Sequence, residues 1–312
     1  MSASRTALRL LDAVRKGRES EVNEMLDSSS WGGDGALDGG GAEEEEQVRD
    51  AALLWAAMLG HVRVMQALVK SGADVRATDS HGYTPLMWAT RGHSHNHALV
   101  VRLLLSSGRS EKEARDRHAG WTPFLHAVAS GNIETVEALM SAGVDFRARD
   151  DAGRTALMIV AGGTTGSTVV GAPGTARGMP CDAKTKLFYE SPESRDPQHA
   201  DDLNEILRKL LATSCARDIN AQDSAAPFEG YTALMYAAGS GHSEQVSMLL
   251  DADSDPKCDM ELRASCGWTA LMAASRCGHT DVVMKLLGAG AVVGRDEPIA
   301  LTGCVVFVSG GA

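Results

Sequence analysis

The sequence predicts an all-α protein built from a stack of similar two-helix units. Only 4% of the 312 residues are aromatic whereas 44% are hydrophobic, so small aliphatic side chains and methionine must fill the core. Such side chains favour closely packed helices over a β-sandwich or barrel. A short motif also recurs along the chain, and an apolar pair follows it at a repeated distance. Repetition of one unit predicts a solenoid, in which each unit packs against its neighbours.

The recurring motif is a hexamer that starts with Thr in five copies, while a sixth copy has lost the Thr. The copies begin at residues 51, 84, 122, 155, 232 and 269. Each Thr suits the N-cap of a helix, where its oxygen accepts a hydrogen bond from a backbone N–H group. Pro85 and Pro123 suit the first helical position. Glycines two residues before each Thr, such as Gly82, predict a turn that leads into the helix.

The apolar pair predicts a second helix in each unit. Val136, Leu139 and Met140 show the i, i+3, i+4 spacing of an apolar helix face. The pair begins 17 residues after the hexamer start in four units, 20 residues after it in the unit at 84, and 55 in the unit at 155. The two longer offsets locate insertions of 3 and 38 residues. The common offset from Leu8 reaches Met25, which predicts a degenerate unit at the start of the chain.

The complete pattern resembles the ankyrin repeat, whose units read Gly-x-Thr-Pro-Leu-His-x-Ala-Ala, then Gly-His, then Val-x-x-Leu-Leu-x-x-Gly-Ala-Asp. Gly241-His242 and Gly278-His279 match its middle, and residues 71–75 match its end. The His after Thr-Pro-Leu is replaced by Met in four copies and by Leu125 in the other. The resemblance implies an ankyrin-repeat solenoid of helix-turn-helix units with short β-turn or hairpin connections.

We expect about six to seven repeats, interrupted twice. The degenerate unit covers residues 1–26, and the other repeats cover 51–161 and 202–293. Residues 27–50 combine Gly and Ser with eight acidic residues against a single Arg, which predicts a flexible acidic insertion. Residues 162–201 are rich in Gly, Thr, Pro and Ser and predict a flexible insertion within a repeat.

Residues 294–312 form an atypical C-terminal tail. The run from Cys304 to Val308 is apolar, whereas the terminal repeat of a solenoid needs a polar outer face. Two interpretations stand. The tail docks on the last unit as a makeshift cap, or the chain is a fragment or has an altered terminus, and the sequence favours the second.

The net charge and the cysteine content restrict the classes of partner and the cellular compartment that we expect. The net charge of −11 disfavours nucleic acid, although residues 27–50 contribute −7 of it. The six cysteines form no Cys-x-x-Cys pair, which favours reduced thiols and a cytoplasmic or nuclear location. The N-terminus has no long apolar run and no apolar stretch is long enough to span a bilayer, so we expect no membrane insertion.

The sequence contains no Walker phosphate loop, Gly-x-Ser-x-Gly elbow, His-Glu-x-x-His motif or Rossmann glycine fingerprint. We therefore expect no enzyme activity, no cofactor, no bound metal and no small-molecule substrate. His93, His95 and His97 alternate, and on a loop or strand they would face one way and suit a metal. The favoured interpretation is a solvated loop in which His93 is the usual His of the repeat. The cysteines of the last units lack the paired short spacings of a zinc site.

The positions that the repeat leaves free are the candidates for partner recognition. One position, between the turn Gly and the Thr of each hexamer, holds four aromatic residues and one Arg; we call it the junction position. The resemblance places it along the β-turn edge of the concave face, where ankyrin proteins bind partners. Tyr, Trp and Arg dominate interface energetics. The alternative is that each ring only packs on its neighbouring hairpin. With two arginines from the ends of the first helices, the candidates are Tyr83, Arg91, Trp121, Arg154, Tyr231, Trp268 and Arg276.

The sequence therefore predicts a non-catalytic, monomeric scaffold or adaptor that binds a partner protein on its concave face. The alternative is a targeting or regulatory ankyrin region of a larger enzyme, such as a kinase or acyltransferase, or of a channel, of which this chain is a fragment. Because ankyrin surfaces encode specificity in freely varying residues, the sequence does not identify the partner.

Overall fold

The computed structural model describes residues 2–27, 41–162, 197–224, 229–293, 300–301 and 304–305. The chain divides into two compact units, Met1–Asp145 and Phe146–Ala312. Apart from a short 3-10 helix and two strands of two residues each, the regular elements among the described residues are α-helices. The prediction of an all-α repeat fold is confirmed.

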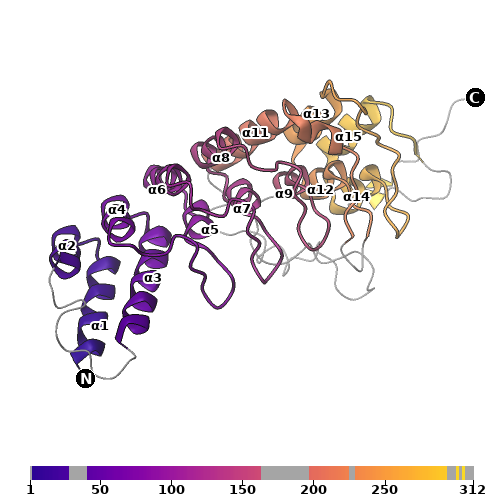
Figure 1. Cartoon of the computed structure of the whole chain (residues 1–312). Coiled ribbons are helices and arrows are strands. Elements are labelled where there is room, and N and C mark those ends of the chain that lie inside the picture. The colour runs from indigo at the N-terminus through magenta and orange to yellow at the C-terminus, as the bar shows by residue number, and fades with distance from the viewer. Residues whose placement is uncertain are drawn as a thin grey trace, which may run out of the picture. The chain divides into compact units, whose positions relative to one another are not determined.

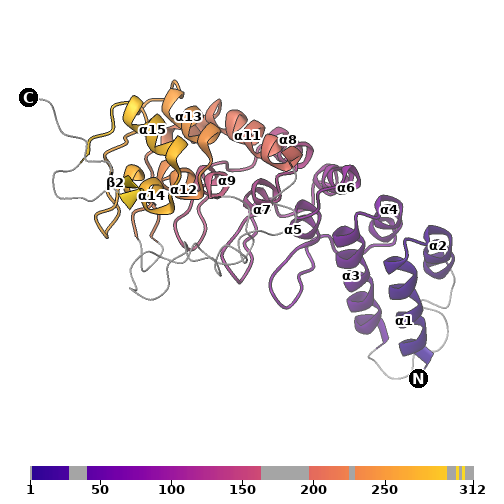
Figure 2. The ribbon, with the colours of Figure 1, turned by 180° about the vertical axis from the view of Figure 1, so that it is seen from behind.

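Unit 1 is a two-layer stack of helix pairs (Figure 1). The inner layer, whose helices begin the pairs, consists of α1 (Ser2–Arg15), α3 (Gly41–Leu59), α5 (Pro85–Thr90) and α7 (Pro123–Ser130). The outer layer consists of α2 (Glu19–Asp27), α4 (Val62–Lys70), α6 (His95–Ser106) and α8 (Ile133–Ser141). Within each layer a helix packs on the next, and the view from behind shows the same order (Figure 2).

Unit 2 repeats this arrangement. Its inner helices are α9 (Ala156–Ala161), α12 (Ala233–Ser240) and α14 (Ala270–Cys277). Its outer helices are α11 (Pro197–Leu211), α13 (Ser243–Asp251) and α15 (Thr280–Gly288), and the 3-10 helix η2 (Ser214–Asp218) follows α11. The strands β1 (Ala300–Leu301) and β2 (Cys304–Val305) pair antiparallel, and β1 lies against α14.

The hexamer threonines cap the inner helices. The hydroxyl of Thr84 accepts a hydrogen bond of 3.2 Å from the backbone N–H of Met87, and the four other hexamer threonines make the equivalent bond. The turn glycine before them adopts positive φ, for example 80° at Gly82. A Cβ on Gly82 would also lie 2.8 Å from the side chain of Arg117 in the next hairpin, so both conformation and space require glycine there.

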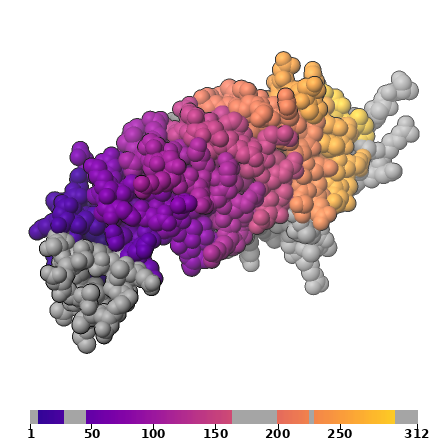
Figure 3. All heavy atoms as spheres, viewed as in Figure 1, coloured from indigo at the N-terminus to yellow at the C-terminus, as the bar shows by residue number. Residues whose placement is uncertain are grey.

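The core consists of the small apolar residues, leucines and methionines of the hexamers and apolar pairs. Met87, Met158 and Met235 are no more than 1% exposed, so they fill space between helices rather than form a surface. In the space-filling view the atoms of successive repeats of unit 1 form a continuous surface (Figure 3). Each helix pair is thus stabilised by burial against its neighbours.

Histidines after the Gly of the inner-helix turn join neighbouring repeats. The ring of His242 bonds to the carbonyl of Ala161, and that of His279 bonds to the carbonyl of Gly239. In the unit with the three-residue insertion, His97 makes the equivalent contact with the preceding repeat: its Nε2 lies 3.0 Å from the carbonyl oxygen of Met58. The assignment of His93 as the usual His of the repeat is therefore corrected: His242 and His279 lie ten residues after their hexamer starts, so the three-residue insertion moves this position from 94 to 97, and His93 is exposed.

Two boundaries differ from the sequence analysis. Helix α3 begins at Gly41, so residues 41–50, expected in the flexible acidic insertion, are helical. Helix α11 begins at Pro197, so residues 197–201 belong to a helix rather than to the expected insertion. In both cases the helix of the adjoining repeat extends beyond the repeat pattern. The remainder of both insertions, and most of the tail, lie outside the described residues.

Candidate partner-binding face

An aspartate in four hairpins ties the hairpin to the inner helix that follows. One carboxylate oxygen accepts hydrogen bonds from backbone N–H groups of the hairpin, as Asp79 does from Tyr83 at 2.9 Å. The other oxygen accepts from a side chain at the start of the helix. The pairs are Asp79 with Trp88 Nε1 at 3.1 Å, Asp116 with His126 Nε2 at 2.8 Å, Asp150 with Arg154 Nε at 2.7 Å, and Asp223 with the Tyr236 hydroxyl at 2.5 Å.

Three of these donors occupy the fifth position of the hexamer. In the unit at 155 this position is Ile159, which has no donor, and Arg154 of the junction position bonds to the aspartate instead. In the last hairpin the aspartate is replaced by Ala264 and the fifth position by Ala273, so both partners are absent together. The aspartates therefore serve to fix the hairpins on the helices.

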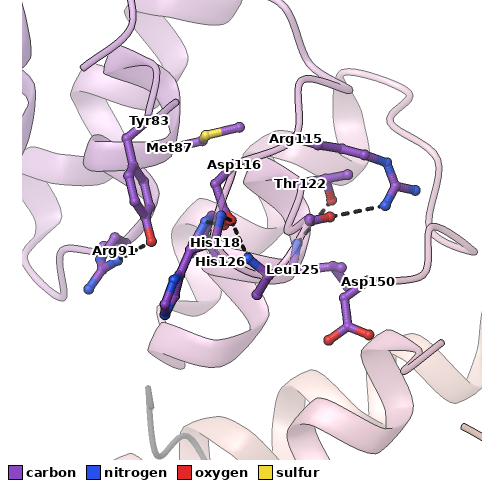
Figure 4. Close-up of polar contacts among 12 residues, drawn as sticks. Tyr83, Met87, Arg91, Arg115, Asp116, His118, Thr122, Leu125, His126 and Asp150 are labelled. Carbon is purple, nitrogen blue, oxygen red and sulfur yellow. Dashed lines mark hydrogen bonds and ion pairs between the residues drawn. The ribbon is translucent and has the colours of Figure 1, made fainter. Parts of the chain in front are cut away.

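The Asp116–His126 pair is buried: the side chains are 1% and 5% exposed. Burial by itself raises the pKa of Asp116, but hydrogen bonds from His126 and from two backbone N–H groups outweigh it and lower the pKa to about 2. Burial lowers the pKa of His126, against the opposing effect of Asp116. The pair is thus a carboxylate accepting a hydrogen bond from a neutral imidazole (Figure 4).

Two candidate residues, Tyr83 and Arg91, lie together in unit 1. The Tyr83 side chain is buried between Trp88 and His126, with ring centroids 5.1 and 5.3 Å from its own. Arg91 is exposed, and its guanidinium donates a hydrogen bond of 3.1 Å to the Tyr83 hydroxyl (Figure 4). The guanidinium carbon lies 5.2 Å from the Tyr83 ring centroid and 5.3 Å from that of Trp88. Tyr83 thus supports Arg91 rather than meeting solvent itself.

The same pairing recurs in unit 2. Arg276 is exposed, and its guanidinium lies 5.3 Å from the ring centroid of Trp268, which is half-buried. The spacing of eight residues between aromatic and Arg equals that of Tyr83 and Arg91. Tyr231 is half-buried and packs on Tyr236, and burial raises its pKa above the ordinary value.

The two other candidates make contacts within their own repeats. Trp121 is half-buried, with its ring centroid 5.2 Å from that of His126. The Arg154 side chain is 19% exposed and is held by Asp150. Arg154 is thus held by its own hairpin, whereas the Tyr83 ring packs on side chains of the inner helices α5 and α7.

The comparisons with known proteins agree with this architecture. A family model of ankyrin repeats matches three stretches, residues 10–116, 94–167 and 198–296. The chain belongs to the ankyrin-repeat family. Ankyrin repeats are non-catalytic modules typical of protein–protein interaction, so the family supports a binding role in general terms.

Several curated proteins share similar ankyrin repeats. Mouse Rabankyrin-5 is 36% identical over 104 residues, which is 33% of this chain and 9% of Rabankyrin-5. Tyrosine-protein kinase HTK16 of Hydra vulgaris is 33% identical over 78 residues, 25% of this chain and 10% of the kinase. Palmitoyltransferase AKR1 of Kluyveromyces lactis is 35% identical over 122 residues, 38% of this chain and 16% of AKR1. The chain thus spans a small part of the length of each of these relatives.

Two tryptophans of the inner helices reach the surface but were not among the candidates from the sequence. Trp55 is 38% exposed and Trp88 is half-buried, and both occupy the fifth hexamer position of successive inner helices. The available signal was the variety at this position, which is Trp, Trp, His, Ile, Tyr and Ala among otherwise apolar hexamers. Such variety is typical of a position at the edge of the core.

The alternating histidines do not converge. His95 and His97 lie in the first turn of α6 rather than on a loop or strand. The Nδ1 of His95 lies 2.6 Å from a carboxylate oxygen of Glu134, whereas His97 faces Ser94 and Met58. Among the described residues no group of three His, Cys, Asp or Glu side chains suits a metal ion. Within the same residues, none of the helices combines the length and apolar character needed to cross a bilayer.

Proposed function

We propose that this protein is a non-catalytic scaffold or adaptor that binds a partner protein on the face formed by its inner helices and hairpins. The observation that carries the proposal is the repeated pairing of an exposed Arg with an aromatic ring. Arg91 lies over Tyr83 and Trp88, and Arg276 lies over Trp268. A stacked guanidinium keeps N–H donors for a ligand and loses little conformational freedom on binding.

The seven candidate residues divide by exposure under this proposal. Arg91, Trp121, Tyr231, Trp268 and Arg276 offer exposed or half-buried surface to a partner. Tyr83 and Arg154 contribute indirectly, because Tyr83 supports Arg91 and Arg154 fixes its own hairpin. We infer that the protein acts as a monomer in the cytoplasm or nucleus, where the six cysteines, which form no Cys-x-x-Cys pair, would stay reduced.

Site-specific photo-crosslinking in cells tests the proposed face. A photoreactive phenylalanine analogue at Trp121 or Trp268 should yield a crosslinked partner protein, because both rings reach the proposed surface. Matched controls place the analogue at Arg102 of outer helix α6 and at Met284 of outer helix α15, which is 66% exposed. Equal crosslinking from the outer helices, or none from the inner face, would contradict the proposal.

Fluorescence microscopy of a tagged chain tests the proposed location of the protein in the cytoplasm or nucleus.

A second candidate role is that of a targeting region within a larger enzyme. It is favoured by the similarity to repeats of a tyrosine-protein kinase and a palmitoyltransferase. The mass of the endogenous protein, detected with an antibody to this chain, distinguishes the two roles. A species that matches this chain alone supports the scaffold, and a larger species with a catalytic domain supports the enzyme.

A further inference from the structure

The inner helices of unit 1 expose an aromatic and apolar strip between two arginines. Trp55 and Trp88 occupy equivalent positions on α3 and α5, which pack side by side. Leu59 is one turn after Trp55 on the same helix face and is 38% exposed. On α1, Leu8 is 65% exposed and lies two turns before Arg15, the residue that stacks on Trp55. The strip therefore runs across α1, α3 and α5.

The two arginines of the strip are held by rings instead of carboxylates. The guanidinium carbon of Arg15 lies 5.4 Å from the ring centroid of Trp55, and that of Arg91 lies 5.3 Å from the ring centroid of Trp88. Both side chains are exposed. Within the described part of the chain, neither has a carboxylate oxygen within 4.0 Å, whereas Arg154 and Arg147 do. Stacking leaves the edge of each guanidinium available for a bidentate bond to an anion.

The spacing of the helices sets the length of a ligand that reaches both arginines. Arg15 lies over Trp55 of α3 and Arg91 lies over Trp88 of α5, so the two guanidinium groups are about one helix spacing apart, roughly 8–10 Å for packed helices. An extended chain covers about 3.3–3.6 Å per residue. A peptide would therefore span the two arginines with about three or four residues, and its middle would lie between Trp55 and Trp88.

We propose that this strip binds an extended acidic peptide segment of the partner protein. Two carboxylate side chains about three or four residues apart pair with Arg15 and Arg91, and an apolar side chain between them contacts Trp55 and Leu59. The inference rests on the proposed protein-binding function and specifies the chemistry of the partner. Charge complementarity selects an acidic segment, since both anchors are cationic and the rings between them are apolar.

Selection of displayed peptides tests the proposal directly. A phage library of random peptides of about twelve residues is selected on the full chain, and enriched peptides are synthesised for fluorescence anisotropy. We expect enriched sequences with two acidic residues about three or four apart and an apolar residue between them. Arg15→Gln and Arg91→Gln should each weaken binding about tenfold, as loss of a charge-assisted hydrogen bond implies.

Arg102→Gln on outer helix α6 is the matched control, because it removes one exposed positive charge from the other layer and should leave affinity unchanged. Circular dichroism verifies that all variants remain folded.

Enrichment of neutral or basic peptides, or acidic binders insensitive to Arg15→Gln and Arg91→Gln, would overturn the inference. Tighter binding of a uridine hexanucleotide than of the selected peptides would overturn it in favour of RNA. If inner-face crosslinking succeeds while the peptide result is negative, only this inference fails; if crosslinking also fails, the proposed function fails with it.

Discussion

At the scale of single residues, the surroundings of a side chain decide whether it recognises a partner or stabilises a repeat. Tyr83 and Trp268 occupy the same junction position, yet Tyr83 is 9% exposed whereas Trp268 is half-buried. Tyr83 is covered because Trp88 and His126 pack on its ring. The fifth-position residue of Trp268's own repeat is Ala273, which is too small to cover that ring in the same way.

The buried His126 predicts a loss of stability at mildly acidic pH. Its folded pKa lies below the ordinary 6.5 because burial disfavours the imidazolium, so below about pH 6.5 the unfolded chain takes up a proton that the folded protein does not. The free energy of unfolding should therefore fall as pH drops below this value, by at most about 1.4 kcal/mol per pH unit for this group. Asp116 adds a further loss as the pH falls from about 3.8 to about 2, because the unfolded chain takes up a proton at this carboxyl before the folded protein does.

Urea denaturation at several pH values measures this effect. His126→Gln should flatten the dependence between about pH 7 and 5, because it removes the titrating group while retaining a hydrogen-bond donor. His118→Gln is the control, since His118 is exposed in the neighbouring hairpin. A slope unchanged by His126→Gln would assign the acid sensitivity to another group.

At the scale of the element, the inner helices from α5 onward begin with a Thr cap, and a histidine joins several repeats to the preceding one. The Thr232 hydroxyl accepts a hydrogen bond of 3.3 Å from the Met235 N–H, and the residue is 2% exposed. The His242 ring then bonds to the Ala161 carbonyl at the end of α9. Local capping and a contact to the preceding repeat thus act on the same helix pair.

Removing the cap should cost a predictable amount of stability. Thr232→Ala should lower the free energy of unfolding by about 1 kcal/mol, the usual value of an N-cap hydroxyl. Thr280→Ala is the matched control, because Thr280 begins α15 but is exposed, and the residue at that N-cap is His279. Chemical denaturation of both variants measures the difference. Equal losses would show that the hydroxyl of Thr232 contributes no specific cap.

At the scale of the whole molecule, stability is distributed by neighbour contacts within each unit. In unit 1, α5 packs between α3 and α7 in the inner layer, whereas α1 packs in this layer on α3 alone among the helices that the structure describes. In a linear array of repeats, an end repeat loses fewer contacts on opening than an internal one.

Hydrogen exchange should reveal this gradient. After correction for intrinsic rates, backbone amides of α5 should exchange at least about tenfold more slowly than those of α1, because opening an internal repeat breaks two interfaces. Exchange followed by mass spectrometry measures both helices in one sample. Equal protection of α1 and α5 would mean that unit 1 opens as a single cooperative block.

Much of the fold was predictable because its signals are local. The caps, the turn glycines and the apolar pairs each follow from residues within one unit, and their recurrence identified the stack. The boundaries of α3 and α11 were less predictable, since helices extend beyond a repeat pattern when the flanking residues tolerate it. The role of His97 did have a sequence signal, because His242 and His279 follow their hexamer starts by ten residues and the insertion adds three to this offset.

The sequence by itself determined the repeat family, the order of the helices and the residue types at the junction positions. Only the tertiary structure decided which of those side chains reach solvent. Exposure depends on what the neighbouring repeat places beside a ring, and those neighbours are about 40 residues away in the chain. The contact of His126 with Tyr83 and the stacking of Arg15 on Trp55 both cross from one repeat to the next, where a pattern read along a single unit has no signal.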